Sequence, residues 1–390
     1  MAKAGDDLAI TLGVEEEFFL IDPDTRDLLV DPDPGIFAAC ARHSGPHKVV
    51  PEFLRSQIET NTRICRRVAD VREALVETRG VVLESAATHG AAVLASSTHP
   101  FAQWTEQAPT RKERYERFAA LFQDAVRRML IGGMHIHAGF GDEDERIRVM
   151  TALRRYLPFL HALSTSSPFS GGRMTGYKSY RLNLFGALPR TSTPAPLRSR
   201  AEYDRLVDEY RRLDFIGDGS ELWWDIRPAA LHPTVELRIC DICPRIDDAV
   251  CIAALYASLI RMLLRQARSD ELPAEPRTEI ILENRWLAQR FGVFAFLGDA
   301  GAGGRMDIDE YAAALIDTLA GDAAALGCEE ELRRVRDMIR DGTSADRQLD
   351  LFRLRRVEGA TEQEALRAVV DLVLAETQEG VPARAGSPSA

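Results

Sequence analysis

The chain of 390 residues has almost no lysine, few cysteines and no long hydrophobic segment. Its longest largely apolar run, residues 249–260, ends at Arg261 and is shorter than the roughly 20 residues that a membrane-spanning helix needs. The first residues also lack the apolar segment of a secretory signal. We therefore expect a cytoplasmic protein that has no membrane partner.

The six cysteines stand at positions 40, 65, 240, 243, 251 and 328. In a long chain without a visible secretory signal, such scattered cysteines are typical of free thiols. Cys240 and Cys243 have the spacing of a zinc-binding pair, but no second pair of this kind follows. We expect buried thiols here and not a structural zinc site.

The chain has fewer basic than acidic residues. The chain has 60 acidic and 49 basic residues and a net charge of -11, whereas a nucleic-acid-binding surface is basic. The hydrophobic content of 45% is ample for a folded core. Because no internal repeat or long linker occurs, we predict one catalytic domain over residues 1–380 with a helical C-terminal part. Residues 381–390 are rich in Pro, Ala, Gly and Ser, which predicts a disordered tail.

Three short segments each place two ligand-type side chains two residues apart. These pairs are Glu15 and Glu17, His135 and His137, and Glu236 and Arg238. Because side chains alternate between the two faces of a strand, each pair would share one face. The solvated face of an ordinary strand would explain any one pair, but three pairs together favour a functional face.

The segment around the two histidines is the most informative of the three. In residues 131–140 the even positions are apolar, whereas the odd positions carry the histidines between two glycines, which indicates close approach of a ligand or of backbone. Carboxylates, imidazoles and a guanidinium on one face can bind divalent cations that bridge an anionic ligand such as ATP. Like carboxylates cannot be held close together without such cations. The pattern predicts a metal-dependent enzyme that acts on phosphates.

Hydrophobic periodicity predicts strands and helices in mixed order. Strands are expected over 9–22, 28–30, 56–62 and 91–96, and the first two would form a hairpin. Helices are expected over 68–90, 110–129, 144–165, 200–213, 245–268, 276–291, 308–325, 329–341 and 361–377.

Four motifs together resemble those of a known family. They are Gly-Val-Glu-Glu-Glu-Phe, Gly-Met-His-Ile-His-Ala-Gly, Val-Glu-Leu-Arg-Ile-Cys-Asp-Ile-Cys-Pro and, from residue 283, Glu-Asn-Arg-Trp-Leu-Ala. In order and spacing they resemble the glutamate–cysteine ligase type 2 family of carboxylate–amine ligases, which belongs to the glutamine synthetase superfamily. The resemblance extends over residues 9–375.

This resemblance implies an α+β fold in which a curved antiparallel sheet, flanked by helices, forms a funnel for ATP and metal. It implies that Mg²⁺ or Mn²⁺ is held by Glu15, Glu17, Glu59, His135 and Glu236. His137 would contact the nucleotide. Arg238 would also bind the nucleotide, at the phosphoryl group that is transferred, so that Arg238 and Glu236 form the catalytic pair.

Three further assignments are more open. Glu59 lies in the short motif Ile-Glu-Thr-Asn-Thr, and Glu52 or Gln57 could take its place. Arg181 and Arg227 are candidates for binding the substrate carboxylate, because a guanidinium group matches a carboxylate with two hydrogen bonds. A structural or surface role would explain these two arginines equally well.

The implied reaction has two steps. A substrate carboxylate attacks the γ-phosphoryl group of ATP, and an amine then displaces phosphate from the acyl phosphate to give an amide. The partners would be a small-molecule acid and a small-molecule amine, with L-glutamate and L-cysteine as the family's own pair. Self-association into a homo-oligomer stays open.

Two other functions are also open. The fold could bind ATP or an amino acid as a sensor without turnover. Alternatively, His135 and His137 could begin a metal-dependent hydrolase barrel, with His161 and His232 as later ligands. Such a barrel needs eight strand–helix units, which the helix-rich C-terminal part does not offer. Residues 171–179 are one insertion away from a phosphate-binding P-loop, and we expect them to form an active-site loop instead.

Overall fold

The structure is a computed structural model that describes residues 8–299 and 304–382, so residues 383–390 of the predicted tail lie outside the described residues. The described strands are β1 (Thr11–Ile21), β2 (Lys48–Pro51), β3 (Gln57–Asn61), β4 (Ala92–Leu94), β5 (Met134–Gly139), β6 (Phe169–Ser170), β7 (Arg173–Met174), β8 (Thr191–Ser192), β9 (Trp223–Trp224), β10 (Ile226–Pro228), β11 (Val235–Leu237), β12 (Phe296–Asp299) and β13 (Gly304–Asp307). The described helices are α1 (Gly35–His43), α2 (Val68–Ala87), α3 (Glu113–Phe122), α4 (Asp124–Arg127), α5 (Glu143–Leu153), α6 (Leu157–Ser164), α7 (Arg181–Phe185), α8 (Arg200–Arg212), α9 (Ile246–Arg268), α10 (Thr278–Phe291), α11 (Ile308–Leu326), α12 (Glu329–Asp341), α13 (Ser344–Val357) and α14 (Glu362–Gln378).

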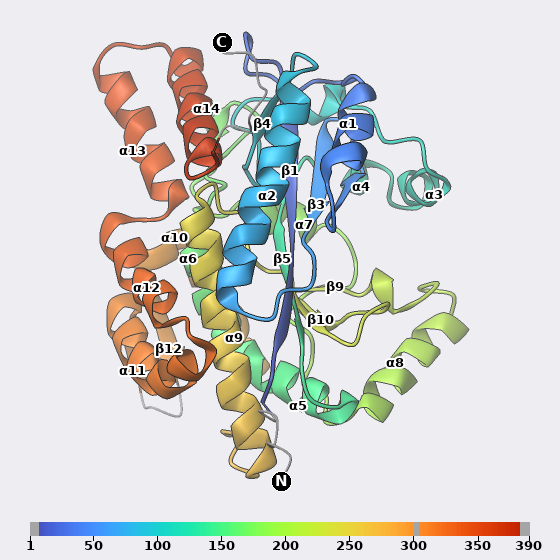
Figure 1. Ribbon diagram of the computed structural model, residues 1–390, viewed down its shortest axis with the longest axis vertical. Helices are drawn as coiled ribbons and strands as arrows, with labels where there is room; N and C mark the ends of the chain where they lie inside the picture. Colours follow the sequence, from blue (N-terminus) through green and yellow to red (C-terminus); the bar gives the residue numbers. More distant parts are fainter. Residues whose placement is uncertain (1–7, 300–303, 383–390) are drawn as a thin grey trace.

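Seven of the described strands form one antiparallel sheet in the order β10-β11-β5-β1-β3-β2, with β4 paired to the end of β1. The long strand β1 is shared by three neighbours: β3 lies along one edge, and β5 and then β4 lie along the other. Helices flank this sheet (Figure 1). The predicted α+β class with a large antiparallel sheet is confirmed.

The two faces of β1 have different surroundings. Val14, Phe18 and Leu20 belong to the main hydrophobic core, and helix α2 packs against the strand on this side. Glu15 and Glu17 lie on the opposite face, because successive side chains of a strand alternate. Thus one face of β1 packs against helices, and the other face carries polar side chains in its first half and buried side chains of a second apolar cluster at its end.

Helix α9 is the central helix of the core. Most of its residues are buried, and it contacts α2, α5, α6, α11 and α12. A helix that is apolar around its whole circumference must be surrounded by protein or lipid. The apolar run at residues 249–260 is therefore a core helix, and no helix of the described residues is long and apolar enough to cross a membrane.

Two predicted helices are interrupted. The helix expected over 110–129 is divided into α3 and α4 at Gln123, whose φ of +48° leaves the helical region. The helix expected over 144–165 is divided into α5 and α6 by a single 3₁₀ turn, Arg154–Tyr156. Pro158 stands in the first turn of α6, where its missing N–H is tolerated.

One predicted strand is absent, and some helices were missed. Residues 28–30 do not form a return strand, because only Leu28 makes an isolated bridge to Ile21. Helices α1, α7 and α13 were not predicted. In α13 charged residues are distributed around the whole helix, so the sequence has little helical periodicity to detect.

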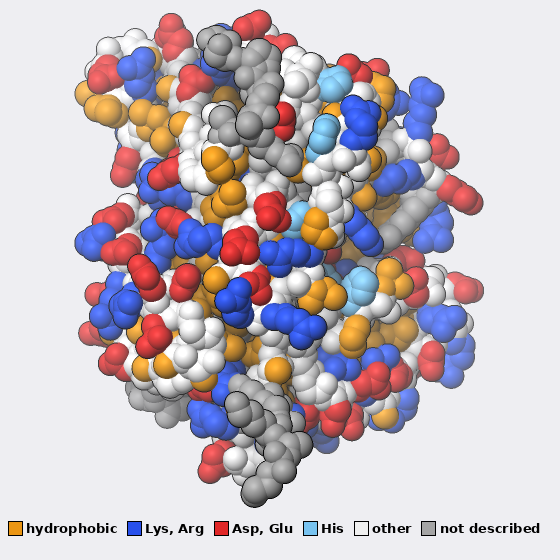
Figure 2. Space-filling model, in the orientation of Figure 1, with side chains coloured by type: hydrophobic (Ala, Val, Ile, Leu, Met, Phe, Trp, Pro, Cys, Tyr) orange, Lys and Arg blue, Asp and Glu red, His pale blue; other side chains and the backbone are white. Residues whose placement is uncertain are grey.

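The C-terminal helices pack onto the rest of the chain. Helix α12 contacts α9, whereas α14 contacts α13 and strand β4 (Figure 1). The assignment of the chain to a single domain stays a prediction. Acidic and basic side chains are intermixed over the face that Figure 2 shows.

The central position of α9 leads to a stability prediction. Leu255 is fully buried in α9, so Leu255→Ala should lower the free energy of unfolding by about 2–5 kcal/mol through lost burial and the cavity left behind. Urea denaturation measures this difference. The control is Leu354→Ala at an exposed position of α13, which should change stability by no more than about 0.5 kcal/mol. Equal losses in the two variants would contradict the assignment of α9 to the core.

Candidate active site

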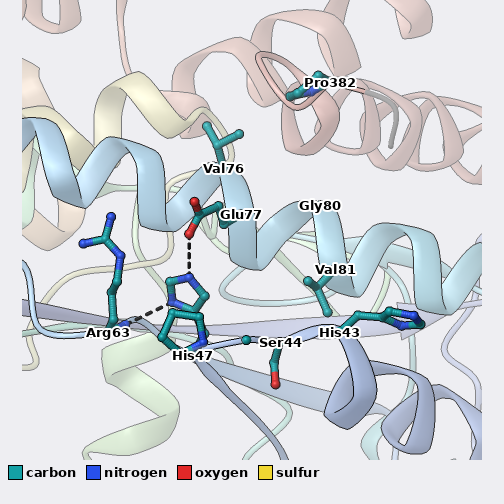
Figure 3. Close-up of a pocket in the computed structure, with 11 residues that line it drawn as sticks. His43, Ser44, His47, Arg63, Val76, Glu77, Gly80, Val81 and Pro382 are labelled. Carbon is teal, nitrogen blue, oxygen red and sulfur yellow. Dashed lines mark hydrogen bonds and ion pairs between the residues drawn. The ribbon is translucent and has the colours of Figure 1, made fainter. Parts of the chain in front are cut away.

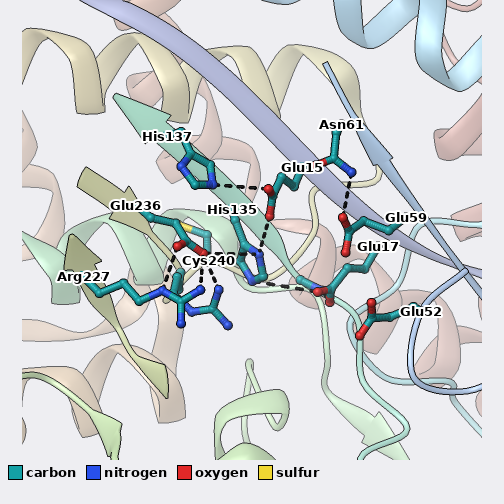
Figure 4. A network of polar contacts seen from close by, with 12 residues as sticks. Glu15, Glu17, Glu52, Glu59, Asn61, His135, His137, Arg227, Glu236 and Cys240 are labelled. Atoms are coloured by element: carbon teal, nitrogen blue, oxygen red, sulfur yellow. Dashed lines mark hydrogen bonds and ion pairs between the residues drawn. The ribbon is translucent and has the colours of Figure 1, made fainter. Parts of the chain in front are cut away.

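Four adjacent strands bring the predicted side chains together. Across the β1–β5 pair, Glu15 lies opposite His135, and across the β1–β3 pair Glu17 lies opposite Glu59. On the outer side of β5, His137 lies opposite Glu236 of β11. All these side chains lie in one polar network on the open face of the sheet (Figure 4).

The two histidines bind Glu15 from one side. His135 Nδ1 lies 3.2 Å from one carboxylate oxygen of Glu15, and His137 Nε2 lies 3.2 Å from the other. Burial alone would raise the pKa of Glu15, but the hydrogen bonds from both histidines outweigh it and hold this pKa well below its usual value. Burial and the charge of Arg238 lower the pKa of His135 to about 4, so this histidine is neutral at pH 7.

Glu236 is held between two arginines. Arg227 binds it with both Nε, at 2.8 Å, and Nη2, at 3.3 Å, while Arg238 Nη1 contacts the same carboxylate. Burial opposes ionisation of Glu236, but the positive charges of Arg238 and Arg227 keep its pKa well below the usual range. Glu236 is therefore ionised at pH 7 and is paired with two charged arginines.

A second group of carboxylates has the opposite behaviour. Burial and neighbouring carboxylates raise the pKa of Glu17 to about 7, of Glu52 to about 7 and of Glu59 to about 8. The Gly133 N–H donates to Glu17 at 2.6 Å, and the Asn61 amide donates to Glu59 at 2.7 Å. These hydrogen bonds do not offset burial and repulsion. Without a cation between them, the three carboxylates cannot all be ionised near pH 7.

The donor set fits a hard divalent cation. Ligand atoms of Glu15, His135 and Glu236 lie within 4.8 Å of one another, and the residues beside them add more carboxylate oxygens. Oxygen-rich sets of this kind suit Mg²⁺ and Mn²⁺, whereas Zn²⁺ prefers nitrogen and sulfur. Metal binding by these residues remains a prediction that this geometry supports.

Arg181 lies beneath the network and not at its surface. Its guanidinium donates to the carbonyl oxygens of Arg238, at 3.2 Å, and Cys240, at 3.3 Å, and lies 3.5 Å from His135 Nε2. A side chain at position 133 would overlap this guanidinium, so Gly133 leaves the space that Arg181 occupies. The glycine beside the histidines was predicted to permit close approach, and in the structure the approaching group is Arg181.

The two arginines proposed for the substrate carboxylate have protein partners in this structure. Arg227 donates to Glu236 and also to the carbonyl oxygens of Ser220 and Leu222. Arg181 is 3% exposed. Their assignment to the substrate stays a prediction, and in this structure both contact other site residues.

Of the competitors for Glu59, Glu52 joins the acidic group and Gln57 does not. Glu52 follows the end of β2, which pairs with β3, and this pairing brings it beside Glu59. Gln57 is buried, and its amide donates to the carbonyl oxygen of Ile131 at 2.6 Å. The only sequence signal for Glu52 is its place directly after the short apolar segment Val-Val-Pro.

The other motifs have structural roles. Of the two later ligands considered for a hydrolase, His161 is fully buried in α6. The ring of His232 does lie near the site, with its centre 6.2 Å from that of the His137 ring. The sheet is antiparallel and not a barrel of strand–helix units, which removes the basis of the hydrolase reading. Residues 169–174 form the β6–β7 hairpin, and Lys178 is paired with Asp346. Cys240 and Cys243 are buried free thiols.

Two cavities lie near the ends of the sheet. One of about 370 Å³ is bordered by His232 and Thr234, and Thr234 is hydrogen-bonded to His137 at 2.9 Å. Another of about 440 Å³ is bordered by His43, His47 and Glu77 and by none of the predicted site residues (Figure 3). The first cavity is thus the one that adjoins the polar network.

The antiparallel sheet and its face of carboxylates, imidazoles and guanidinium groups define an α+β protein with a candidate site for metal and phosphate. Residues 11–371 match the family described as Glutamate-cysteine ligase family 2, and the chain belongs to this family. This membership confirms the prediction of an ATP-dependent carboxylate–amine ligase of the glutamate–cysteine ligase type.

Individual relatives agree along almost the whole chain. A Rhodospirillum rubrum protein named "Putative glutamate--cysteine ligase 2" is 43% identical and is aligned over 97% of this chain and 98% of its own length. A Chloroflexus aurantiacus protein with the same name is 35% identical over 97% of this chain and 95% of its own.

Two solved structures share the fold. One is a glutamate–cysteine ligase from Francisella tularensis in complex with AMP, with a TM-score of 0.66, 13% identity and coverage of 96% of this chain and 90% of that chain. The other is a bifunctional glutathione synthetase from Pasteurella multocida, with a TM-score of 0.68 and 14% identity over 96% of this chain. This chain spans about half, 53%, of the Pasteurella protein.

The raised pKa values predict how stability depends on pH without metal. The folded-state pKa values of Glu17, Glu52 and Glu59 exceed the ordinary value of 4.5, so between pH 6.5 and 8 the folded protein binds more protons than the unfolded chain. Stability should therefore fall as the pH rises through this window. Three buried histidines with lowered pKa values, His135 among them, oppose this trend near pH 6.5 but little above pH 7.5, because an unfolded histidine has by then lost nearly all of its proton, so the glutamates dominate the window.

Melting temperatures of the protein in the presence of a chelator test this expectation. The melting temperature should be lower at pH 8 than at pH 6.5, and Mg²⁺ should reduce the difference because it lets the carboxylates ionise. Glu59→Gln should also reduce the difference, since it removes the group with the highest of the three pKa values. A melting temperature that rises between the two pH values would contradict the assignment.

Proposed function

We propose that this chain joins L-glutamate to an amine, with L-cysteine as the first candidate, through a γ-glutamyl phosphate made from ATP. The observation that supports this most directly is the placement of four glutamates and two histidines on one face of four adjacent strands, with Glu52 and Arg238 directly after the ends of β2 and β11. The names of the relatives point to the same pair of substrates.

The proposed metal ligands are Glu15, Glu17, Glu59, His135 and Glu236, with Glu52 as a further carboxylate. Mg²⁺ or Mn²⁺ bound there would neutralise charge on the ATP phosphates. Glu15 and Glu236 are already ionised, and His135 is neutral, so these three donors need lose no proton to bind a cation.

Arg238 is the proposed partner of the transferred phosphoryl group. One of its nitrogens pairs with Glu236, and this ion pair fixes the guanidinium at the same face as Glu15 and Glu17. A preoriented cation stabilises charge that develops in the transition state without needing to rearrange. The amine then attacks the acyl phosphate, a step that requires exclusion of water so that the activated acid is not hydrolysed.

The nucleotide is proposed to approach from the His137 side of the network. The cavity of about 370 Å³ lies beside Thr234, and the Thr234 hydroxyl binds His137 Nδ1. Toward the other end of the network lie Glu17 on β1, Glu59 on β3 and Glu52 directly after β2 (Figure 4). This arrangement leaves the acid and the amine to bind near the second carboxylate group.

Isotope transfer tests the reaction class. An amide-forming ligase passes one carboxylate oxygen to phosphate when the amine displaces it, so glutamate labelled with ¹⁸O in its γ-carboxylate should yield singly labelled inorganic phosphate. Mass spectrometry should find this phosphate in amounts equal to the ADP formed. Unlabelled phosphate with equal ADP would indicate an ATPase, and a phosphate that stays on the acceptor would indicate a kinase. Either result would overturn the proposal.

Glu17 offers a test of the metal assignment. Glu17→Gln keeps the size of the side chain but removes a negative charge from the network, so Mg-ATP affinity should fall at least tenfold while the melting temperature is maintained or raised. Isothermal titration calorimetry measures the affinity. The control is Glu362→Gln on the exposed first turn of α14, which should bind Mg-ATP like the wild type. Unchanged affinity in Glu17→Gln would remove Glu17 from the site.

A further inference from the structure

The middle residue of the motif Glu15-Glu16-Glu17 points away from the active site. Glu16 lies on the core face of β1, between the apolar side chains of Val14 and Phe18, and is 0% exposed. A carboxylate in such surroundings is unfavourable unless it is paired. Its partner is Arg79 of α2, which is also 0% exposed.

All three guanidinium nitrogens of Arg79 donate hydrogen bonds. Its Nε and Nη2 bind the two carboxylate oxygens of Glu16 at 3.0 and 2.5 Å. The same guanidinium also donates to the carbonyl oxygen of Cys243 at 2.7 Å and to that of Pro244. It stacks 5.6 Å from the centre of the Phe18 ring.

These contacts connect the two sides of the central strand β5. Across the sheet, Glu16 of β1 pairs with Met134 of β5, and the Met134 N–H in turn donates to the carbonyl oxygen of Cys240, in the segment after β11. Cys243 and Pro244 continue this segment. Arg79 therefore joins β1 to the chain that follows β11, while β5 lies between them.

The three ligand-type residues in closest mutual contact come from these same strands. Glu15 is on β1, His135 is on β5 and Glu236 is on β11. Because sheet hydrogen bonds fix only neighbouring strands to each other, the distance between Glu15 and Glu236 depends on two successive pairings. A rigid guanidinium that binds both outer elements from the core side limits this distance directly.

Stability alone does not account for a buried ion pair at this position. Replacing such a pair by apolar side chains of similar volume is often neutral or stabilising, because desolvation of the two charges offsets their attraction. Apolar side chains cannot, however, replace the directional hydrogen bonds that the Arg79 guanidinium donates to Glu16, Cys243 and Pro244.

We propose that the Arg79–Glu16 ion pair is a positioning device for the metal site, which sets the separation of Glu15 and Glu17 on β1 from Glu236 on β11. Arg79 and Glu16 touch neither substrate nor metal and act through the backbone of the strands that carry the ligands. This inference rests on the proposed function, because it requires that the network bind a divalent cation.

The test measures Mn²⁺ binding by electron paramagnetic resonance, which requires no turnover. The variant is the double substitution Glu16→Met and Arg79→Met, which removes both charges together and leaves no unpaired buried ion. The control is Arg347→Met with Glu376→Met, a partly buried ion pair between α13 and α14 outside the polar network. Melting temperatures of all three proteins are measured in the same buffer.

We expect the Glu16/Arg79 double variant to fold with a melting temperature near that of the wild type and to bind Mn²⁺ at least fivefold more weakly. The Arg347/Glu376 control should bind Mn²⁺ within twofold of the wild type. If the Glu16/Arg79 variant binds Mn²⁺ as the wild type does, the pair is purely structural and this inference fails, while the proposed function stands. If the wild type binds no Mn²⁺, the proposed function and this inference fail together.

Arg79→Lys decides the question if the double variant does not fold. The lysine keeps the charge next to Glu16, but its single nitrogen cannot reproduce the planar fork that reaches the carboxylate and both carbonyl oxygens. Weaker Mn²⁺ binding by folded Arg79→Lys supports the positioning role, and wild-type binding overturns it.

Discussion

Electrostatic repulsion among glutamates on one face of the sheet is the constraint on which the rest of the site depends. The structure meets it in two ways. Glu15 and Glu236 are ionised because histidines and arginines contact them directly, with Arg227 and Arg238 on Glu236. Glu17, Glu52 and Glu59 lack comparable cationic contacts, so burial and the neighbouring carboxylates raise their pKa values toward or above neutrality. A divalent cation would resolve the second group, and this is the physical reason to expect metal-dependent chemistry here.

The architecture around the site follows from this constraint. An antiparallel sheet places ligands from four strands in register, while its other face is covered by α2 and the core that surrounds α9. The space below the histidines is filled by Arg181, which requires a glycine at position 133. The Arg79–Glu16 pair joins the strands from the core side. On the core face of β1 Glu16 is therefore paired with an arginine from a distant segment, whereas on the site face Glu15 is bound by the two histidines of β5.

Family membership and substrate choice are separate questions for this enzyme. The two sequence relatives described above are 43% and 35% identical over nearly the full chain, which establishes the family. The solved structures are only 13–14% identical and establish the fold. A cation cluster that neutralises phosphate charge is common to many reactions of ATP, whereas the acid and the amine are selected by side chains outside it. In the arrangement that we propose, the identity of the substrates depends on the residues around the second carboxylate group.

Part of this site was determined by the sequence alone. The two-residue spacing of Glu15 with Glu17 and of His135 with His137 is a local property, and a strand converts it directly into a shared face. Apolar periodicity likewise predicted α9, although the weak periodicity of α13 left that helix undetected. Only the tertiary structure decided which distant residues meet. Glu52 joins Glu59 through the pairing of β2 with β3, and Glu16 finds Arg79 63 residues further along the chain. No local pattern encodes these contacts, because strand order and helix packing are set by burial of the whole core and not by neighbouring residues.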